Sequence, residues 1–175
     1  MDESKLLVVV DMQNDFINGS LGSVEAESIV SNVKEKIEKW QGDIAYTMDT
    51  HYDNYESTIE GEKLPIVHCK KGTIGWEVNC AIMMALNKKE KVKCFEKETF
   101  GSLALADFAN KKAYKSIELV GLCTDICVIM NACLIKTFCV NCKITVDATC
   151  CMGITKQSHN NALEAMKMCQ IDIID

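Results

Sequence analysis

The chain of 175 residues has no arginine: all nineteen basic residues are lysines, set against 25 acidic residues, and the net charge is −6. A site that grips a carboxylate or a phosphate with a planar guanidinium fork is therefore excluded. The acidic balance also argues against binding to nucleic acid or to an anionic membrane surface.

Long apolar runs are missing as well. The apolar run at residues 6–10 is far shorter than a membrane span or the core of a signal peptide. Eleven cysteines, an odd number, occur in this setting, and several lie inside apolar segments, where a free thiol acts as a small hydrophobic group. A reducing, cytoplasmic location is the simplest interpretation.

Proline is scarce too, and the single proline, Pro65, does not mark a domain boundary by itself. The sequence shows neither internal repeats nor linker-like tracts, and 48% apolar with 25% charged residues is typical of a globular protein. We therefore expect residues 1–175 to form a single domain.

Apolar patterning predicts strands that alternate with helices, which is typical of an α/β protein. The expected strands are 5–10, 43–48, 92–95, 116–120, 143–147 and 171–174, and the expected helices are 25–40, 77–86, 103–110, 124–140 and 155–169. Residues 49–75 have no sustained period and are predicted to be a long loop. The alternation predicts a mostly parallel sheet with helices on both faces, and ligands bind such sheets at the carboxyl ends of the strands.

Three residues near predicted strand ends carry groups suited to acyl transfer. Asp11 and Lys97 follow strands, and Cys127 lies in the first turn of a predicted helix, where the helix dipole favours the thiolate. The carboxylate would accept the thiol proton and the ammonium would hold negative charge. Taken singly, the Asp is better explained as a turn residue, the Lys as a surface charge, and the Cys as a structural thiol.

A second set of residues has the ligand types of a divalent metal site. Asp49 and His51 follow a predicted strand, and His68 lies further along the loop. The competing interpretation is that these are scattered loop histidines. His159, on the last predicted helix, is interpreted as a capping or packing residue.

The spacing of Cys139 and Cys142 is that of half a zinc knuckle, and Cys150 and Cys151 follow shortly after. A structural zinc site needs four ligands at consistent spacing, so packing at a helix end explains these cysteines better.

Five motifs in the same order identify a resemblance to the isochorismatase-like cysteine hydrolases, and within them to the nicotinamidases. They are Asp11-Met-Gln-Asn-Asp-Phe16, Thr47-Met-Asp-Thr-His51, His68-Cys-Lys-Lys-Gly-Thr73, Lys97-Glu-Thr-Phe-Gly-Ser102 and Gly121-Leu-Cys-Thr-Asp-Ile-Cys-Val128. The resemblance covers nearly the whole chain and implies a three-layer, Rossmann-like α/β sandwich with a parallel sheet. It also implies that Asp11 is the general base, Lys97 its charge partner and Cys127 the nucleophile.

The resemblance further implies a cis peptide bond between Leu122 and Cys123, with the backbone N–H groups of Cys123 and Cys127 directed at an oxyanion. The same resemblance assigns a metal ion to Asp49, His51 and His68, with zinc, iron and manganese all compatible with these donors.

Two departures from the nicotinamidase pattern affect the expected pocket. Tyr55 stands where many nicotinamidases have another His, and either Glu60 or Glu62 is a candidate for an additional metal ligand. An aromatic residue expected shortly before the last metal His is missing, and Phe16 and Trp76 are the candidates to line the pocket in its place.

The leading hypothesis is hydrolysis of nicotinamide, or a close aryl amide, to the acid and ammonia through a cysteine thioester, a reaction of NAD salvage. The alternative within the enzyme class is a metal-independent hydrolase of the isochorismatase or N-carbamoyl amide type. From a different class, the eleven cysteines suggest a thiol-rich protein that buffers metal or senses oxidants. The expected partner is a small amide, and assembly into a homo-oligomer stays open.

Overall fold

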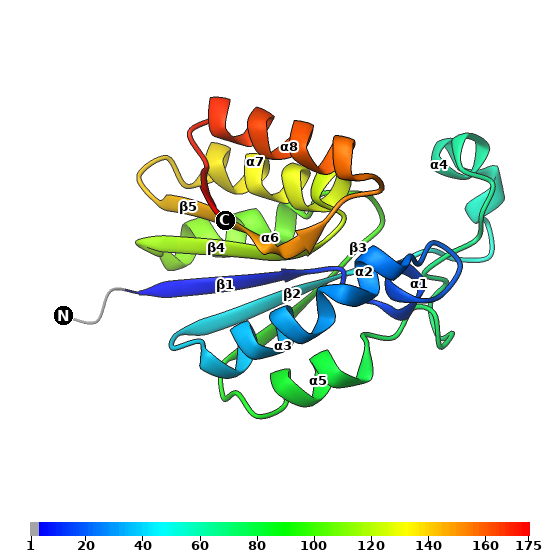
Figure 1. The fold of residues 1–175 in the computed structure, drawn as a ribbon, viewed down its shortest axis with the longest axis horizontal. Helices are drawn as coiled ribbons and strands as arrows, with labels where there is room; N and C mark the ends of the chain where they lie inside the picture. Colours follow the sequence, from blue (N-terminus) through cyan, green and yellow to red (C-terminus); the bar gives the residue numbers. More distant parts are fainter. Residues whose placement is uncertain (1–3) are drawn as a thin grey trace.

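The computed structural model describes residues 4–175, and within them six strands pair in parallel into one sheet. The order across the sheet is β3-β2-β1-β4-β5-β6 (Figure 1). The strands are β1 (Lys5–Val10), β2 (Asp43–Asp49), β3 (Val92–Lys97), β4 (Ser116–Leu122), β5 (Lys143–Met152) and β6 (Asp172–Ile174).

Strand β1 runs through the middle of the sheet and is buried on both sides. Leu6, Val8 and Val10 belong to one hydrophobic cluster, while Leu7 and Val9 belong to the cluster on the opposite face. Such double burial explains why the sequence of this strand is a continuous apolar run rather than an alternating one.

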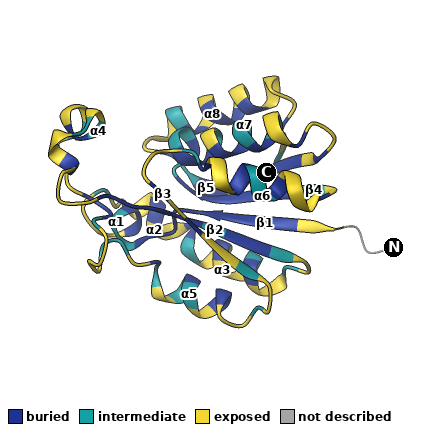
Figure 2. Cartoon of the chain, turned by 180° about the vertical axis from the view of Figure 1, so that it is seen from behind, coloured by how far each residue is buried: buried dark blue, intermediate teal, exposed yellow. Residues whose placement is uncertain are grey.

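Helices cover both faces of the sheet, so the predicted three-layer α/β fold is confirmed. Figure 1 shows α3 and α5 on one side and α6, α7 and α8 on the other, and Figure 2 shows that their buried sides face the sheet. The helices of the first side are α1 (Asn14–Ile17), α2 (Val24–Ser28), α3 (Val30–Lys39) and α5 (Cys80–Leu86). Those of the second are α6 (Leu103–Lys112), α7 (Ile129–Phe138) and α8 (Lys156–Met168).

The helix predicted at 25–40 is in fact two helices. Ser23 caps α2 by accepting a hydrogen bond from the N–H of Ala26, and α2 ends at Ser28. The N–H of Ile29 bonds to Glu27 and not to the carbonyl four residues back, so the helical ladder is interrupted there. Because the Ile29 side chain is buried like those of the helices on either side, the apolar periodicity continues through the break and does not reveal it.

The predicted loop at 49–75 also contains two short helical segments, η1 (Tyr55–Ser57) and α4 (Ile59–Lys63). The side chain of Thr58 accepts a hydrogen bond from the N–H of Gly61 and so starts α4. Propensity alone does not predict a helix of five residues, because short helices depend on such caps and on tertiary contacts.

Two further elements differ from expectation. The predicted helix at 124–140 begins with a π-helical turn, η2 (Thr124–Val128), before α7 starts at Ile129. Strand β5 continues past the predicted end at residue 147 to Met152, beyond a register shift against β4.

The capping box at the start of α8 is complete, because Thr155 and Ser158 bond each other's backbone N–H groups.

The candidate residues lie at the carboxyl ends of the strands, beside the point where the strand order of the sheet reverses. Strands β1 and β4 are neighbours, but the chain leaves them toward opposite edges of the sheet, which is the usual location of ligand sites in parallel sheets. Among residues 4–175, none of the helices has the length and apolar character needed to cross a membrane.

Candidate active site

Asp11 directly follows β1 and is completely buried. Its backbone N–H donates to Thr47 Oγ1 at 3.2 Å, and the Thr47 hydroxyl in turn donates to Asp11 Oδ1 at 2.6 Å. Strand β2 therefore fixes one carboxylate oxygen of Asp11 and leaves the other, Oδ2, for a different partner.

That partner is Lys97, the last residue of β3. Its Nζ lies 2.7 Å from Asp11 Oδ2, 3.1 Å from Asp49 Oδ1 and 3.6 Å from Cys127 Sγ. The structure thus brings together Asp11, Lys97 and Cys127, which are 116 positions apart at their extremes in the sequence (11 to 127).

The three groups perturb one another strongly in this buried setting. Burial raises the pKa of Asp11, an effect that the charge of Lys97 opposes and the charge of Asp49 reinforces. Burial alone would lower the pKa of Lys97, but the negative charges of Asp11 and Asp49 outweigh this effect and raise that pKa, so this ammonium stays protonated. Burial, followed by the charge of Asp11, raises the pKa of Cys127 well above its usual range.

The expectation that a helix start would favour the Cys127 thiolate is therefore wrong. Cys127 lies in the π-helical turn that precedes α7, so it does not sit on the first turn of an α-helix with its aligned N–H groups. Burial removes water from the thiolate, and the adjacent Asp11 carboxylate repels it. The resting thiol keeps its proton and needs a base to remove it.

The turn that carries Cys127 begins at a close contact between strands. At Gly121 the backbone has φ +119°, and a Cβ there would lie 2.1 Å from the carbonyl oxygen of Val10, so only glycine fits. The peptide bond between Leu122 and Cys123 is cis, as the resemblance implies. The carbonyl of Cys123 then accepts hydrogen bonds from the N–H groups of Ile126 and Val128.

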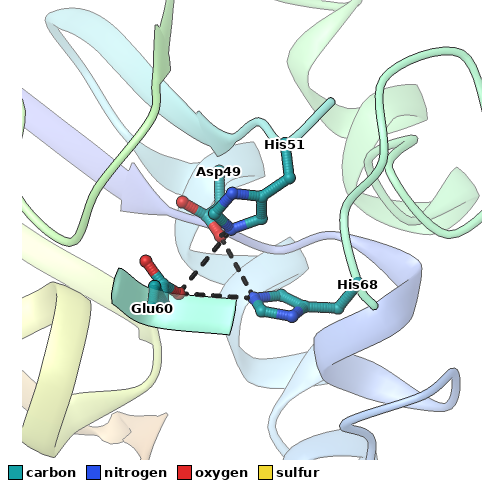
Figure 3. A group of neighbouring side chains, drawn as sticks. All are labelled: Asp49, His51, Glu60 and His68. Carbon is teal, nitrogen blue, oxygen red and sulfur yellow. Dashed lines mark ion pairs between the residues drawn. The ribbon is translucent and has the colours of Figure 1, made fainter. Parts of the chain in front are cut away.

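Four side chains form a second cluster beside the first: Asp49, His51, Glu60 and His68 (Figure 3). Their ligand atoms all lie within 4.8 Å of one another. Asp49 ends β2, Glu60 comes from α4, and the histidines come from the loop segments on either side of that helix. Of the two candidate glutamates, Glu60 belongs to this cluster, whereas Glu62 is solvent-exposed.

The donor set fits a divalent metal ion. Ligands bound at about 2.0–2.1 Å in a tetrahedron lie roughly 3.3 Å apart, and the His–carboxylate separations here run from 2.9 to 3.7 Å. His68 Nδ1–H donates to the carbonyl of Ile66 at 2.8 Å, so Nε2 is the ring nitrogen that faces the cluster (Figure 3).

His51 provides a more direct indication. Its Nε2 lies 2.9 Å from Asp49 Oδ2, but the contact does not have the geometry of a hydrogen bond, and no other group among residues 4–175 bonds this buried nitrogen. A buried ring nitrogen without a hydrogen bond is costly unless something else binds it. Burial alone would raise the pKa of Asp49, but His51, His68 and Lys97 outweigh it and hold that pKa well below its usual range.

Aromatic rings support the two histidines. The Tyr55 ring lies 4.6 Å from the His51 ring and 5.2 Å from the His68 ring, and its hydroxyl donates to the carbonyl of Leu64. Tyr55 thus packs against the ligands where a further His was expected. Phe16, a predicted pocket residue, lies 5.5 Å from the His68 ring.

Trp76, the other predicted pocket residue, is held at both ends beside the metal cluster. Its indole N–H donates to Thr50 Oγ1 at 3.0 Å, and its carbonyl accepts a hydrogen bond from Gln13 at 2.8 Å. Gln13 also pairs with both the N–H and the carbonyl of Asp49, at 2.7 and 2.8 Å. Sequence reasoning assigned no role to Gln13, although it lies in the first motif, because its contacts are made with a strand 36 residues away.

Comparisons with known proteins identify the family of this chain. The isochorismatase domain family matches residues 5–175. The "Uncharacterized isochorismatase family protein PncA" of Bacillus subtilis is 30% identical over 142 residues, which is 73% of this chain and 76% of that protein. The chain therefore belongs to the isochorismatase family of hydrolases.

Solved structures of two related enzymes resemble the chain over nearly its whole length. A pyrazinamidase of Pyrococcus horikoshii, solved in complex with zinc, is 26% identical with a TM-score of 0.82, and the match covers 98% of this chain and 99% of that one. A pyrazinamidase/nicotinamidase of Streptococcus mutans is 22% identical with a TM-score of 0.86, over 98% and 100% of the two chains. The second likeness, at that identity, concerns the fold alone.

Proposed function

We propose that this hydrolase converts nicotinamide, or a close aryl amide, to the carboxylic acid and ammonia through a thioester on Cys127. The observation that carries the proposal is the position of Lys97, whose Nζ contacts Asp11, Cys127 and Asp49 at once. A base, a nucleophile and a fixed positive charge therefore meet beside a cluster of metal-ligand type.

In the first half of the reaction, Asp11 takes the proton of the Cys127 thiol as Sγ attacks the carboxamide carbon. The raised pKa values of both groups suit this exchange, because neither the thiolate nor the carboxylate is strongly favoured in the buried site. The backbone N–H groups of Cys123 and Cys127 receive the negative oxygen of the tetrahedral intermediate. The C–N bond then breaks, and Asp11 returns the proton to the leaving nitrogen, which departs as ammonia.

In the second half, water attacks the thioester. Asp11 accepts a proton from this water, the C–S bond breaks to release the acid, and Asp11 returns the proton to the departing Cys127 thiolate. Lys97 keeps its charge throughout and offsets the negative charge that passes between Asp11 and Cys127. A single carboxylate thus serves as base and acid in turn.

Asp49, His51, Glu60 and His68 would hold a divalent ion in this proposal. Such an ion supplies a Lewis-acidic position for the ring nitrogen of the substrate, which orients the ring. Two nitrogen and two oxygen donors are compatible with zinc, iron or manganese. Phe16, beside His68, and Trp76, bonded to Thr50, are the aromatic residues that we assign to the walls of the substrate pocket.

Ammonia release from a small amide panel tests the proposal. Nicotinamide and pyrazinamide should be hydrolysed, N-carbamoyl compounds should not, and chelation should raise the KM for nicotinamide more than it destabilises the fold. Hydrolysis of N-carbamoyl compounds at a rate that chelation leaves unchanged would instead support the metal-independent alternative.

The third hypothesis, a protein that buffers metal or senses oxidants through many thiols, has less support. Five other cysteines are buried, and burial raises their pKa and so keeps their thiols protonated and unreactive: Cys69, Cys139, Cys142, Cys150 and Cys151. Cys80, Cys94 and Cys169 are exposed, so any measurement of Cys127 reactivity has to identify the modified peptide.

A further inference from the structure

His159 is a buried titratable residue that the proposed mechanism does not use. It lies near the start of α8, with 9% of its surface exposed. Its Nδ1 is 2.8 Å from Oγ1 of Thr124, a residue that is completely buried and opens the π-helical turn that ends with Cys127 and Val128. A side chain of α8 thus contacts the segment that carries the nucleophile.

The segment before His159 is fixed to the same turn at a second point. The carboxylate of Asp125 accepts a hydrogen bond from the N–H of Ile154, at 3.1 and 3.2 Å to its two oxygens. A Cβ at Gly153 would lie 3.0 Å from the backbone of His159, so glycine permits the chain to fold back this closely. The capping box of Thr155 then sets the start of α8 at Lys156, two residues after Ile154.

The turn needs such support because its own backbone bonds specify it weakly. A π-helical turn is rare and less regular than an α-helix, and here it spans only Thr124–Val128. Val128 and Ile126 both bond to the carbonyl of Cys123, while the N-cap position of the turn has no side-chain hydrogen bond. Thr124 was expected near the helix start, yet its hydroxyl bonds His159 rather than the backbone of its own turn.

We propose that His159 is a positioning residue for the nucleophile: through its hydrogen bond to Thr124 it holds the turn that places Cys127 Sγ beside Asp11 and Lys97. The inference rests on the proposed function only in assigning Cys127 as the nucleophile. Burial lowers the pKa of His159 against the opposing charge of Asp125, so the ring is neutral and makes a single, defined hydrogen bond through Nδ1.

Kinetics of three single variants and one double variant test the contact. His159→Ala and Thr124→Val each remove one partner, and we expect kcat for nicotinamide to fall about ten- to hundredfold, with KM within about twofold of wild type. His159→Asn keeps a hydrogen-bonding group near the Nδ1 position and should recover most of the loss. The double variant His159→Ala/Thr124→Val should lose no more than the worse single variant, because both changes break the same bond.

Two matched variants on α8 separate positioning from general stability. Asn160→Ala changes an exposed neighbour on the same helix and should leave kcat unchanged. Met166→Ala removes a fully buried side chain two turns further along, so it destabilises α8 without touching Thr124, and its kcat should also stay near wild type at a temperature where it is folded. A kcat loss in Met166→Ala equal to that in His159→Ala, or additive losses in the double variant, would overturn the inference.

Hydrogen–deuterium exchange provides a readout that does not depend on the substrate. Peptides that cover residues 121–130 should exchange faster in His159→Ala and in Thr124→Val than in wild type, and at the wild-type rate in Met166→Ala. Faster exchange in a protein that hydrolyses none of the amides would reject the proposed function and keep the positioning role. Unchanged exchange and unchanged kcat in an active enzyme would reject the positioning role alone.

Discussion

The two halves of the candidate site are built differently. Asp11 and Lys97 stand at the ends of parallel strands, and Cys127 lies in the turn after β4; at most 5% of any of these residues is exposed. The metal cluster takes only Asp49 from a strand, and its Glu60 side chain, from the short helix α4, is 19% exposed.

The difference lies in what holds each half in place. The ends of β1 and β3 fix Asp11 and Lys97, and the contacts from His159 and Ile154 support the turn that carries Cys127, so groups of the chain itself hold these three residues. The other three candidate metal ligands belong to the segment after β2, where the separations between histidines and carboxylates are 2.9–3.7 Å, and a bound ion would hold such a set together. Asp49 belongs to both halves, because Oδ1 contacts Lys97 and Oδ2 faces the histidines.

The largest effect should come from the catalytic half. Cys127→Ala removes the nucleophile, and we expect ammonia release from nicotinamide to fall by at least about a thousandfold while the circular dichroism spectrum stays that of the wild type. Cys139→Ala is the matched control, since Cys139 is also buried but lies at the far end of α7. Turnover above a few per cent in Cys127→Ala would mean that another thiol attacks the amide.

Asp11→Asn should separate two properties of the nucleophile. The amide cannot move protons, so turnover should fall about 10²–10⁴-fold. The Asp11 carboxylate also raises the pKa of Cys127, so its removal should lower that pKa and shift the modification of Cys127 by iodoacetamide to lower pH.

Peptide mapping after alkylation at a series of pH values measures this shift, while ammonia release measures turnover. A loss of turnover accompanied by an upward shift of the alkylation midpoint would argue that Asp11 acts on Cys127 by some means other than its charge and its basicity.

In the metal half, His51→Ala and His68→Ala should each lose the bound ion, with a drop in metal affinity of at least about a hundredfold. Elemental analysis of the purified wild type should find about one divalent ion per chain. Because neither histidine contacts the turn that carries Cys127 in the contacts described above, alkylation of Cys127 in these variants should stay within about twofold of wild type. A wild type that is free of metal and hydrolyses nicotinamide at full rate would contradict the assignment.

The smallest effect should come from the most exposed ligand. Glu60→Gln should weaken metal binding about tenfold, as measured by competition with a chelating dye, because three ligands remain. Glu62→Gln is the matched control two residues away on the same helix, and it should bind the ion like the wild type. Equal weakening by both changes would indicate a long-range charge effect and not ligation.

The same division explains which parts the sequence predicts. The apolar runs of β1 and β4 are buried on both faces, so their composition alone identifies them as strands of a parallel sheet. Once the strands are placed, the residues at their carboxyl ends, such as Asp11 and Lys97, are identified as candidate site residues. Glu60 could not be separated from Glu62, because a five-residue helix within a long loop has no periodicity to orient its side chains.

Contacts between distant segments are the other part that sequence reasoning misses. The bond between Thr124 and His159 joins residues 35 positions apart, and neither residue belongs to a pattern that pairs it with the other. The interrupted helix at Ile29 and the π-helical turn at Cys127 likewise depend on packing against the sheet, which local propensity does not contain.

The backbone at Asp11 limits what evolution or engineering can place there. Its φ of +46° lies in the left-handed region, where asparagine, aspartate and glycine are tolerated and most other residues are strained by roughly 1–2 kcal/mol. The backbone conformation favours asparagine, aspartate and glycine at this position, and of these only aspartate can transfer a proton. A glutamate would bring a suitable base on an unsuitable backbone, and a histidine would lack the carboxylate that pairs with Lys97, so a library that randomises only position 11 should return aspartate alone among active clones. A different base in this fold would have to be introduced from another strand.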